Sequence, residues 1–366
     1  MVLTVLADEN IPGLDWLDAN GFSVRTKNGR TITADDLIGV EVLLVRSVTQ
    51  VDEALLKTSQ VVFVGSCTIG TDHVDLEWLA SNNIHFANAP GCNANAVVDY
   101  VVTAMLSEFS LTELRAKTVG VLGAGQVGSR LVKRLDQLAI PSRVCDPFVA
   151  VANDSLDDVL ACDVISLHVP LTRSVEYATY HLIDAVALSQ LKEGAMLINT
   201  SRGQVIDEEA LSYAVNRLSI KAVLDVFASE PVPDNELLSK LLIKTPHIAG
   251  YSVQGKLRGS LQVFEALFQF LGRAYDKPAL LDDTHSVLTF KSLPLLLDEV
   301  FEIQKLSRDF YAAFVAASTT DEKAACFDQF RKRSASRNEW GSIQVTCQDA
   351  SANLLSNLGF LCPTRN

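Results

Sequence analysis

A glycine-rich loop, Gly123–Gly128, stands between a predicted strand, Thr118–Leu122, and a predicted helix, Gln126–Leu138. Its sequence, GAGQVG, has the G-x-G-x-x-G spacing of dinucleotide-binding turns. In such a turn Gly123 permits the tight bend, Gly125 lets backbone approach a pyrophosphate, and Gly128 lets helix and strand pack closely. The helix N-terminus then faces the phosphates with its partial positive charge. The chain is therefore expected to fold around a Rossmann-type α/β domain.

Short apolar runs rich in β-branched residues alternate with helical stretches on both sides of this loop. Continuous runs of this kind are typical of parallel strands that are covered on both faces. The predicted strands are Val2–Ala7, Val42–Val45 and Val61–Val64 before the loop, and Ser142–Cys145, Val164–Leu167, Ala195–Asn199 and Lys221–Leu224 after it. Predicted helices include Ala94–Phe109, Asp207–Asn216 and Gly255–Leu271. This alternation predicts two series of βαβ units and hence two doubly wound sheets.

The final eighty residues or so exceed what two nucleotide-type domains require. Leu293–Ala317 is apolar at helical spacing, Ser342–Thr346 alternates like a strand, and Ala350–Leu358 fits a packing helix. The predicted fold class is α/β: flavodoxin-like and Rossmann doubly wound domains with a cleft between them, plus a small α+β C-terminal domain. The expected boundaries are 1–92 with 257–284, 93–256, and 285–366.

Composition narrows the class of protein. A net charge of -13 argues against a nucleic-acid-binding surface, which needs a basic stripe. The seven cysteines are dispersed, and no CxxC pair occurs, so we expect reduced thiols, a cytoplasmic location and no metal site. The apolar N-terminus lacks a basic region, and no apolar run approaches the ~20 residues of a membrane span.

Three residues downstream of the loop supply the parts for moving a hydride and a proton. Arg202 ends a strand, where a guanidinium can bind a carboxylate and polarise the neighbouring C2 oxygen; a surface ion pair is the structural alternative. Glu230 precedes a proline, and His247 follows one. A carboxylate bonded to one imidazole nitrogen leaves the other to take a hydroxyl proton. Together they predict a nicotinamide-dependent dehydrogenase acting on a small anionic 2-hydroxy acid.

Other polar clusters lie at strand ends or in the tail. Asp146, at the end of the strand after the loop, can accept from both ribose hydroxyls and would repel a 2'-phosphate, which favours NAD over NADP. Ser47 and Thr68 follow strands of the first series, where they either donate to a substrate anion or cap turns. The basic run at 330–333 with Arg337 indicates a solvated face, or one that meets acidic surface on a partner subunit.

Taken jointly, the fingerprint, the 199–211 segment, the Ser229–Pro231 turn and Pro246-His247 resemble the D-isomer-specific 2-hydroxyacid dehydrogenase family. The resemblance implies that Arg202, Glu230 and His247 are the active-site residues, with His247 the proton donor and acceptor. It implies substrate contacts from Ser47, Thr68 and Tyr251. The NAD contacts that it implies are Gly123, Gly125, Gln126, Val127, Gly128, Asp146, Thr200, Ser201, Asp225 and Gly250.

One branch of that family, which acts on a phosphorylated four-carbon 2-hydroxy acid in the pathway to pyridoxine 5'-phosphate, is more similar still. The similarity lies in Ala7–Asn10, Val45–Thr49, Phe63–Gly65, Gly70–Asp75, Ala89–Ala94, His247–Lys256 and the tail segments Glu339-Trp340 and Asp349–Ser351. It implies a homodimer formed through the C-terminal domain. The substrate phosphate needs its own cation, for which Arg46 and Arg258 are the candidates.

Two alternatives stay open at this point. Another member of the same family, acting on phosphoglycerate or glycerate, would keep the reaction and change the substrate. A non-catalytic NAD(H)-sensing protein built on the same fold could also retain the three residues, and a turnover assay separates it from an enzyme.

Overall fold

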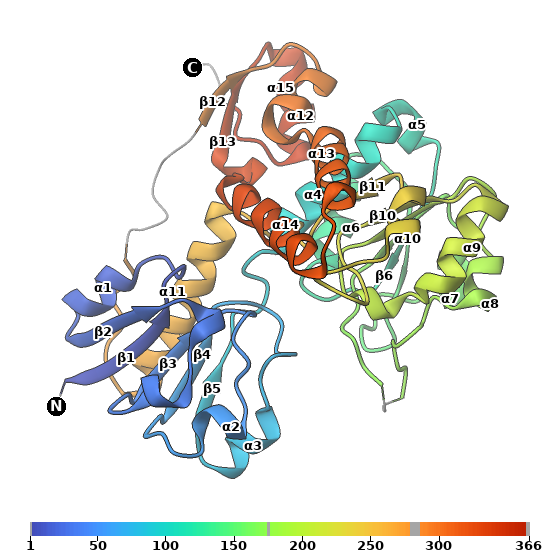
Figure 1. Cartoon of the computed structure of the whole chain (residues 1–366). Helices are drawn as coiled ribbons and strands as arrows, with labels where there is room; N and C mark the ends of the chain where they lie inside the picture. Colours follow the sequence, from blue (N-terminus) through green and yellow to red (C-terminus); the bar gives the residue numbers. More distant parts are fainter. Residues whose placement is uncertain (1, 174–175, 279–285, 364–366) are drawn as a thin grey trace. The chain divides into compact units, whose positions relative to one another are not determined.

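The computed structural model describes residues 2–173, 176–278 and 286–363 (Figure 1). The chain forms two compact units. The first comprises Met1–Asn93 with Val253–Thr284, and the second comprises Ala94–Ser252 with His285–Asn366. The C-terminal segment thus belongs to the unit that carries the glycine loop. The division of roles into substrate-binding, NAD-binding and dimerisation domains stays a prediction.

The first unit is built on a five-stranded parallel sheet of order β2-β1-β3-β4-β5. This order is the flavodoxin-like arrangement of doubly wound sheets. The strands are β1 (Leu3–Asp8), β2 (Phe22–Lys27), β3 (Val42–Val45), β4 (Phe63–Ser66) and β5 (His85–Ala87). The helices are α1 (Leu14–Ala19), α2 (Glu53–Leu56), α3 (Leu76–Ser81) and α11 (Val253–Phe270).

Each face of this sheet has its own core because successive strand residues point to opposite sides. In β3, Leu44 packs in the core that α1 and α11 cover, whereas Leu43 packs in the core beneath α2 and α3. Gly65 in β4 lets α11 approach the sheet, since an added Cβ would lie 2.3 Å from Val263. Helix α11, encoded far downstream, is therefore an integral layer of the first unit.

The second unit contains a six-stranded parallel sheet of order β11-β10-β9-β8-β6-β7. The strand order reverses between β6 and β8, which is where doubly wound sheets bind their ligands, outside the carboxyl ends of the strands. The strands are β6 (Val119–Leu122), β7 (Ser142–Cys145), β8 (Val164–Leu167), β9 (Met196–Asn199), β10 (Lys221–Leu224) and β11 (Ile243–Lys244). The helices that accompany them are α4 (Ala94–Glu108), α5 (Leu111–Arg115), α6 (Gly128–Gln137), α7 (Leu156–Leu160), α8 (Ala185–Ser189), α9 (Glu208–Leu218) and α10 (Asn235–Lys240).

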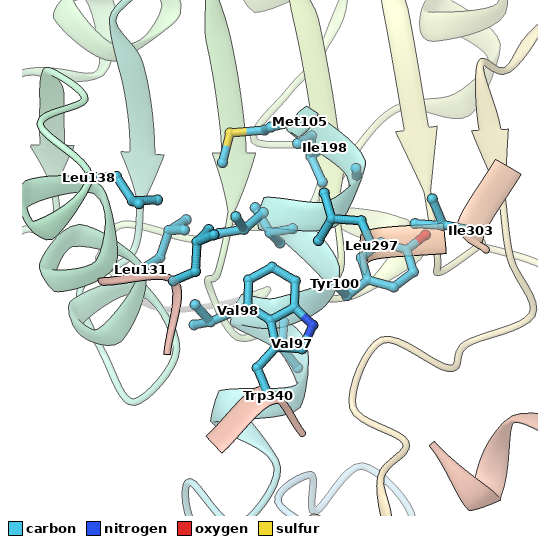
Figure 2. Packing of buried hydrophobic residues seen from close by; sticks show 14 of the residues in the cluster. Val97, Val98, Tyr100, Met105, Leu131, Leu138, Ile198, Leu297, Ile303 and Trp340 are labelled. Atoms are coloured by element: carbon cyan, nitrogen blue, oxygen red, sulfur yellow. The ribbon is translucent and has the colours of Figure 1, made fainter. Parts of the chain in front are cut away.

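The C-terminal segment adds a two-stranded parallel sheet and four helices to this unit. Its elements are β12 (Ser286–Thr289), α12 (Leu293–Phe301), α13 (Ile303–Ala316), α14 (Thr320–Arg333), β13 (Ile343–Thr346) and α15 (Asp349–Leu358). Trp340, only 1% exposed, lies in the same core as Val97, Val98 and Tyr100 of α4 (Figure 2). Phe310 and Phe327 join the core on the opposite side of the sheet. The tail is thus packed into both cores of the second unit.

Most predicted elements lie within two residues of those in the structure, and the exceptions have simple causes. The apolar run predicted over Leu293–Ala317 is two helices, since Glu302 leaves helical geometry between α12 and α13. Among the described residues, no helix combines the length and the apolar character that crossing a bilayer requires.

Candidate active site

The glycine loop has the backbone geometry that a dinucleotide turn requires. Gly123 has φ +91°, and an added Cβ would lie 2.6 Å from the carbonyl oxygen of His168. At Gly128 an added Cβ would lie 1.8 Å from the Gly123 carbonyl oxygen, so only glycine lets α6 start this close to β6. Gly125 is exposed, with open space where its side chain would be. A phosphate can therefore approach the backbone at the start of α6.

Asp146 follows β7 and faces the same loop. Its Oδ2 accepts from the Ala124 amide at 2.7 Å, and its Oδ1 accepts from the Phe148 amide at 2.9 Å. The Gln126 side chain is engaged with the adjacent helix α6, because its Oε1 accepts a hydrogen bond from Arg130 at 2.9 Å. Val127 is the N-cap residue of α6, and its side chain makes no capping hydrogen bond. The open Gly125 backbone and the adjacent carboxylate together fit the phosphate and ribose ends of a dinucleotide.

The turn after β9 holds Arg202 through an asparagine that the sequence analysis did not single out. Asn199 accepts from the Ser201 amide at 3.0 Å and from its hydroxyl at 2.8 Å, and it donates to the Arg202 carbonyl at 2.9 Å. Arg202 in turn donates through Nη1 to the Ser201 carbonyl at 2.8 Å. The Thr200 hydroxyl oxygen is buried without a hydrogen-bond partner in the described structure, which leaves it able to serve a bound group.

A glycine brings the Arg202 turn against the turn that carries Glu230. An added Cβ at Gly203 would lie 1.9 Å from the backbone carbon of Phe227, so the two backbones touch. Glu208 fixes the same place, because its Oε1 accepts from the Ala228 amide at 2.7 Å. The Arg202 and Glu230 turns are therefore neighbours at the carboxyl edge of the sheet.

Glu230 and His247 form the hydrogen-bonded pair that the sequence predicted, while their catalytic role stays a prediction. Glu230 Oε2 lies 2.8 Å from His247 Nδ1, and Glu230 Oε1 accepts from the Phe227 amide at 2.9 Å. Burial raises the pKa of Glu230, but the charge of His247 and its hydrogen bond outweigh burial, so the net pKa is below the ordinary value. The carboxylate is thus ionised, and Nε2 of His247 is left as the nitrogen that can exchange a proton. The His247 side chain is 36% exposed, which makes it accessible to a substrate.

The backbone of His247 is held in the left-handed region, with φ +56°. Asp225 sustains this geometry: its carbonyl accepts from the His247 amide at 2.7 Å. Its fully buried carboxylate accepts from the amides of Ile248 and Ala249 at 2.8 Å each, and from the Thr245 hydroxyl at 2.6 Å. Burial raises the pKa of Asp225 to about 6, while the His247 charge pulls it down. The contact of Asp225 with NAD stays a prediction.

The C-terminal segment holds the other side of the His247 loop. Arg337 donates through its guanidinium to the carbonyl oxygens of Tyr251, at 3.0 Å, and of Ala249, and Glu339 accepts from the Ser252 hydroxyl at 2.8 Å. The expectation of a solvated basic run is therefore wrong for Arg337, and also for Arg331, whose side chain is 13% exposed. It holds for the exposed residues at 332 and 333. Gly250 lies within this braced loop.

Three of the predicted substrate residues of the first unit follow the neighbouring strands β3 and β4, and the fourth, Arg258, lies on α11. Ser47 is exposed after β3, and Thr68, after β4, shares a hydrogen bond of 2.9 Å with Ser66. Arg46 Nε lies 3.1 Å from Oδ2 of the buried Asp8. Arg258 donates through Nε to the Cys92 carbonyl at 2.9 Å. How these side chains meet the residues of the second unit stays a prediction.

Comparison with known proteins places this geometry in a family. A family model described as the NAD-binding domain of D-isomer specific 2-hydroxyacid dehydrogenases matches residues 95–249. The erythronate-4-phosphate dehydrogenase of Pseudomonas fluorescens is 41% identical, with 96% of this chain and 97% of that protein covered. The protein of the same name from Edwardsiella ictaluri is 42% identical, with 98% and 99% covered.

Solved structures share the fold. The 3-phosphoglycerate dehydrogenase of Entamoeba histolytica, which has NAD+ bound, superposes with a TM-score of 0.65. It is 23% identical and covers 76% of this chain and 99% of its own. At this identity the likeness concerns the fold alone.

Proposed function

The chain belongs to the erythronate-4-phosphate dehydrogenases of the D-isomer specific 2-hydroxyacid dehydrogenase family, and from that premise we propose that it oxidises 4-phospho-D-erythronate with NAD+. The product is (R)-3-hydroxy-2-oxo-4-phosphobutanoate, on the route to pyridoxine 5'-phosphate. The observation that carries the proposal is the 2.8 Å pair of Glu230 and His247 beside the Arg202 turn. The relatives with this name match the chain over nearly its whole length.

The reaction separates the C2–H and O–H hydrogens of the alcohol. NAD+, when bound, supplies the carbon that accepts the C2 hydride. Nε2 of His247 takes the hydroxyl proton, and Glu230 keeps the ring oriented and stabilises the imidazolium that forms. Arg202 binds the substrate carboxylate and stabilises negative charge as it develops on the C2 oxygen. Proton and hydride leave together, and the C2–OH becomes a carbonyl.

The remaining contacts rest on the resemblance to the family and, for Asp146, Arg46 and Arg258, on residue chemistry. Asp146 would bind the adenosine ribose hydroxyls and select NAD over NADP. Thr200, Ser201, Asp225 and Gly250 would line the nicotinamide side, as the glycine loop lines the pyrophosphate. Ser47, Thr68 and Tyr251 would donate to the substrate. Arg46 and Arg258 are the proposed phosphate ligands from the first unit.

We also propose that the C-terminal segment forms a homodimer. Its support is the resemblance to the branch that has this extra domain. A cytoplasmic location fits the seven cysteines, all of which are free thiols in the described structure. Sedimentation of the purified protein tests the dimer, and a monomer at micromolar concentration would contradict it.

A substrate panel tests the function. Purified protein with NAD+ is given 4-phospho-D-erythronate, D-3-phosphoglycerate or D-glycerate, and NADH formation is followed. The expected result is a clear preference in kcat/KM for the four-carbon phosphate. Preference for a three-carbon acid would keep the reaction and replace the substrate. NADH binding without turnover of any acid would point to a sensor rather than an enzyme.

A further inference from the structure

Arg331, on α14 of the C-terminal segment, lies beside the catalytic loop. Its guanidinium carbon is 5.3 Å from the centroid of the Tyr251 ring. Tyr251 stands four positions after His247 in the same loop. The side chain of Arg331 is 13% exposed, unlike its exposed neighbours at 332 and 333. The Arg331 guanidinium therefore points inward, toward the residues around the Glu230–His247 pair, which we call the dyad.

The charge of Arg331 is only loosely compensated. Its Nη1 lies 3.6 Å from Oδ1 of Asp328, beyond good hydrogen-bond distance. Its Nε is buried and has no acceptor in the described structure. The field of Arg331 also reaches the dyad, where it contributes to lowering the pKa of Glu230. A buried guanidinium whose Nε donates to no acceptor is stabilised when an anion binds to it. Its position beside the candidate active site makes a substrate anion the natural partner.

The two cations proposed from the first unit already have structural contacts. Arg46 lies against the fully buried carboxylate of Asp8, and Arg258 holds the Cys92 carbonyl. A phosphate dianion usually takes several donors, because three oxygens share its charge. Arg202 cannot serve both ends of the substrate, since the proposed mechanism assigns it to the carboxylate.

We propose that Arg331 binds the C4 phosphate of the substrate, which makes the C-terminal segment a part of the substrate-binding site. This assignment rests on the proposed function. The Nε edge of the guanidinium offers parallel donors that match two phosphate oxygens. Tyr251 supports the guanidinium plane through its ring face. Discrimination between phosphorylated and unphosphorylated acids then depends on a residue that lies outside both doubly wound sheets.

The test compares Arg331→Met with Arg333→Met, which removes the same charge from an exposed position on the same helix. Steady-state kinetics are measured with 4-phospho-D-erythronate and with D-erythronate, which has no phosphate. Arg331→Met is expected to lower kcat/KM for the phosphorylated acid by on the order of 10–100-fold, as loss of a charged hydrogen-bonded pair implies. The value for D-erythronate should fall far less, so the ratio of the two specificities collapses. Arg333→Met should leave that ratio unchanged.

Equal losses with both acids would show that Arg331 only supports the fold or the dyad, and would overturn the assignment. An unchanged ratio in an active, folded variant would overturn it as well. Guanidinium ions added to Arg331→Met should restore turnover of the phosphorylated acid selectively, which a purely structural defect would not show. Wild-type protein that fails to oxidise 4-phospho-D-erythronate would overturn both the proposed function and this inference.

Discussion

Glu230 Oε2 and His247 Nδ1 lie 2.8 Å apart, although the two residues come from separate loops at the carboxyl edge of one sheet. The contact fixes which ring nitrogen faces the carboxylate and leaves Nε2 for the reaction. Around it, Asp225 braces the His247 loop from the sheet, and Arg337 braces it from the tail. The pair is therefore held from several sides, which is the preorganised geometry that the proposed acid–base role requires.

Replacing His247 with Gln removes the proton acceptor while keeping a polar side chain. His247→Gln is expected to lower kcat by on the order of 10²–10⁴, the usual contribution of general acid–base catalysis. NADH affinity, measured by fluorescence titration, should change little, because the glycine loop and Asp146 do not involve His247. An unchanged kcat would reject His247 as the base.

Glu230 predicts a pH-dependent stability difference. Its pKa lies below the ordinary 4.5, so in acid the unfolded chain binds more protons than the folded one. The stability that the carboxylate contributes is complete above 4.5 and is lost as pH falls through the lowered native pKa. The difference in Tm between wild type and Glu230→Gln should therefore shrink as pH falls below about 4.5. A difference that stays constant across this acid range would contradict the ionised pair.

Asp225→Asn should displace the His247 loop while every proposed catalytic residue is retained. The amide puts an N–H where one carboxylate oxygen accepts from Ile248 or Ala249, and leaving a buried donor unpaired costs about 1–3 kcal/mol. The loop should shift, and the displaced imidazole should lower kcat by about 10²-fold. Asp184→Asn is the matched control, since Asp184 caps α8 and asparagine is an equally good N-cap. A kcat for Asp225→Asn equal to that of the control would show that the carboxylate does not position His247.

Two substitutions in the glycine loop should have different effects, one on the stability of the fold and the other on NAD binding. Gly128→Ala would place a Cβ 1.8 Å from the Gly123 carbonyl oxygen, so we expect a loss of about 1–3 kcal/mol in unfolding free energy, seen as a lower Tm. Gly125→Ala meets open space and should leave Tm of the ligand-free protein unchanged. Its methyl group should nevertheless weaken NAD binding, because it occupies the approach to the backbone. If Gly125→Ala bound NAD as well as wild type does, the pyrophosphate would lie elsewhere.

The sequence predicted the parts of the fold that depend on local pattern. The continuous β-branched runs Val42–Val45 and Val164–Leu167 coincide with β3 and β8, since a strand buried on both faces has no polar face to obscure it. Strand β2 was missed because it lies at the sheet edge and carries exposed Arg25. Helix α14 was missed because its composition is polar, with only Phe327 and Phe330 buried.

In the candidate site, too, features that depend on local sequence could be predicted, whereas features that depend on distant segments could not. The roles proposed for Glu230 and His247 rested on residue type and turn context, and the structure brings the two together. The left-handed backbone of His247 and its bracing by Arg337 depend on segments distant in the chain, so no local pattern indicates them. Arg331 did leave a signal: it lies four positions after the buried Phe327, and therefore one helical turn further along the same side of α14. A charged residue on the buried face of a helix indicates a candidate binding residue.

Transfer of deuterium from C2 of the substrate to the cofactor tests the proposed oxidation at C2. Substrate labelled at C2, 4-phospho-D-[2-²H]erythronate, is incubated with the purified protein and NAD+, and both products are analysed by mass spectrometry and NMR. The label is expected on the nicotinamide ring of NADH, together with one equivalent of the 2-oxo acid. His247→Gln is expected to slow this transfer without redirecting the label. Unlabelled NADH, or label released to water, would contradict oxidation at C2 by this site.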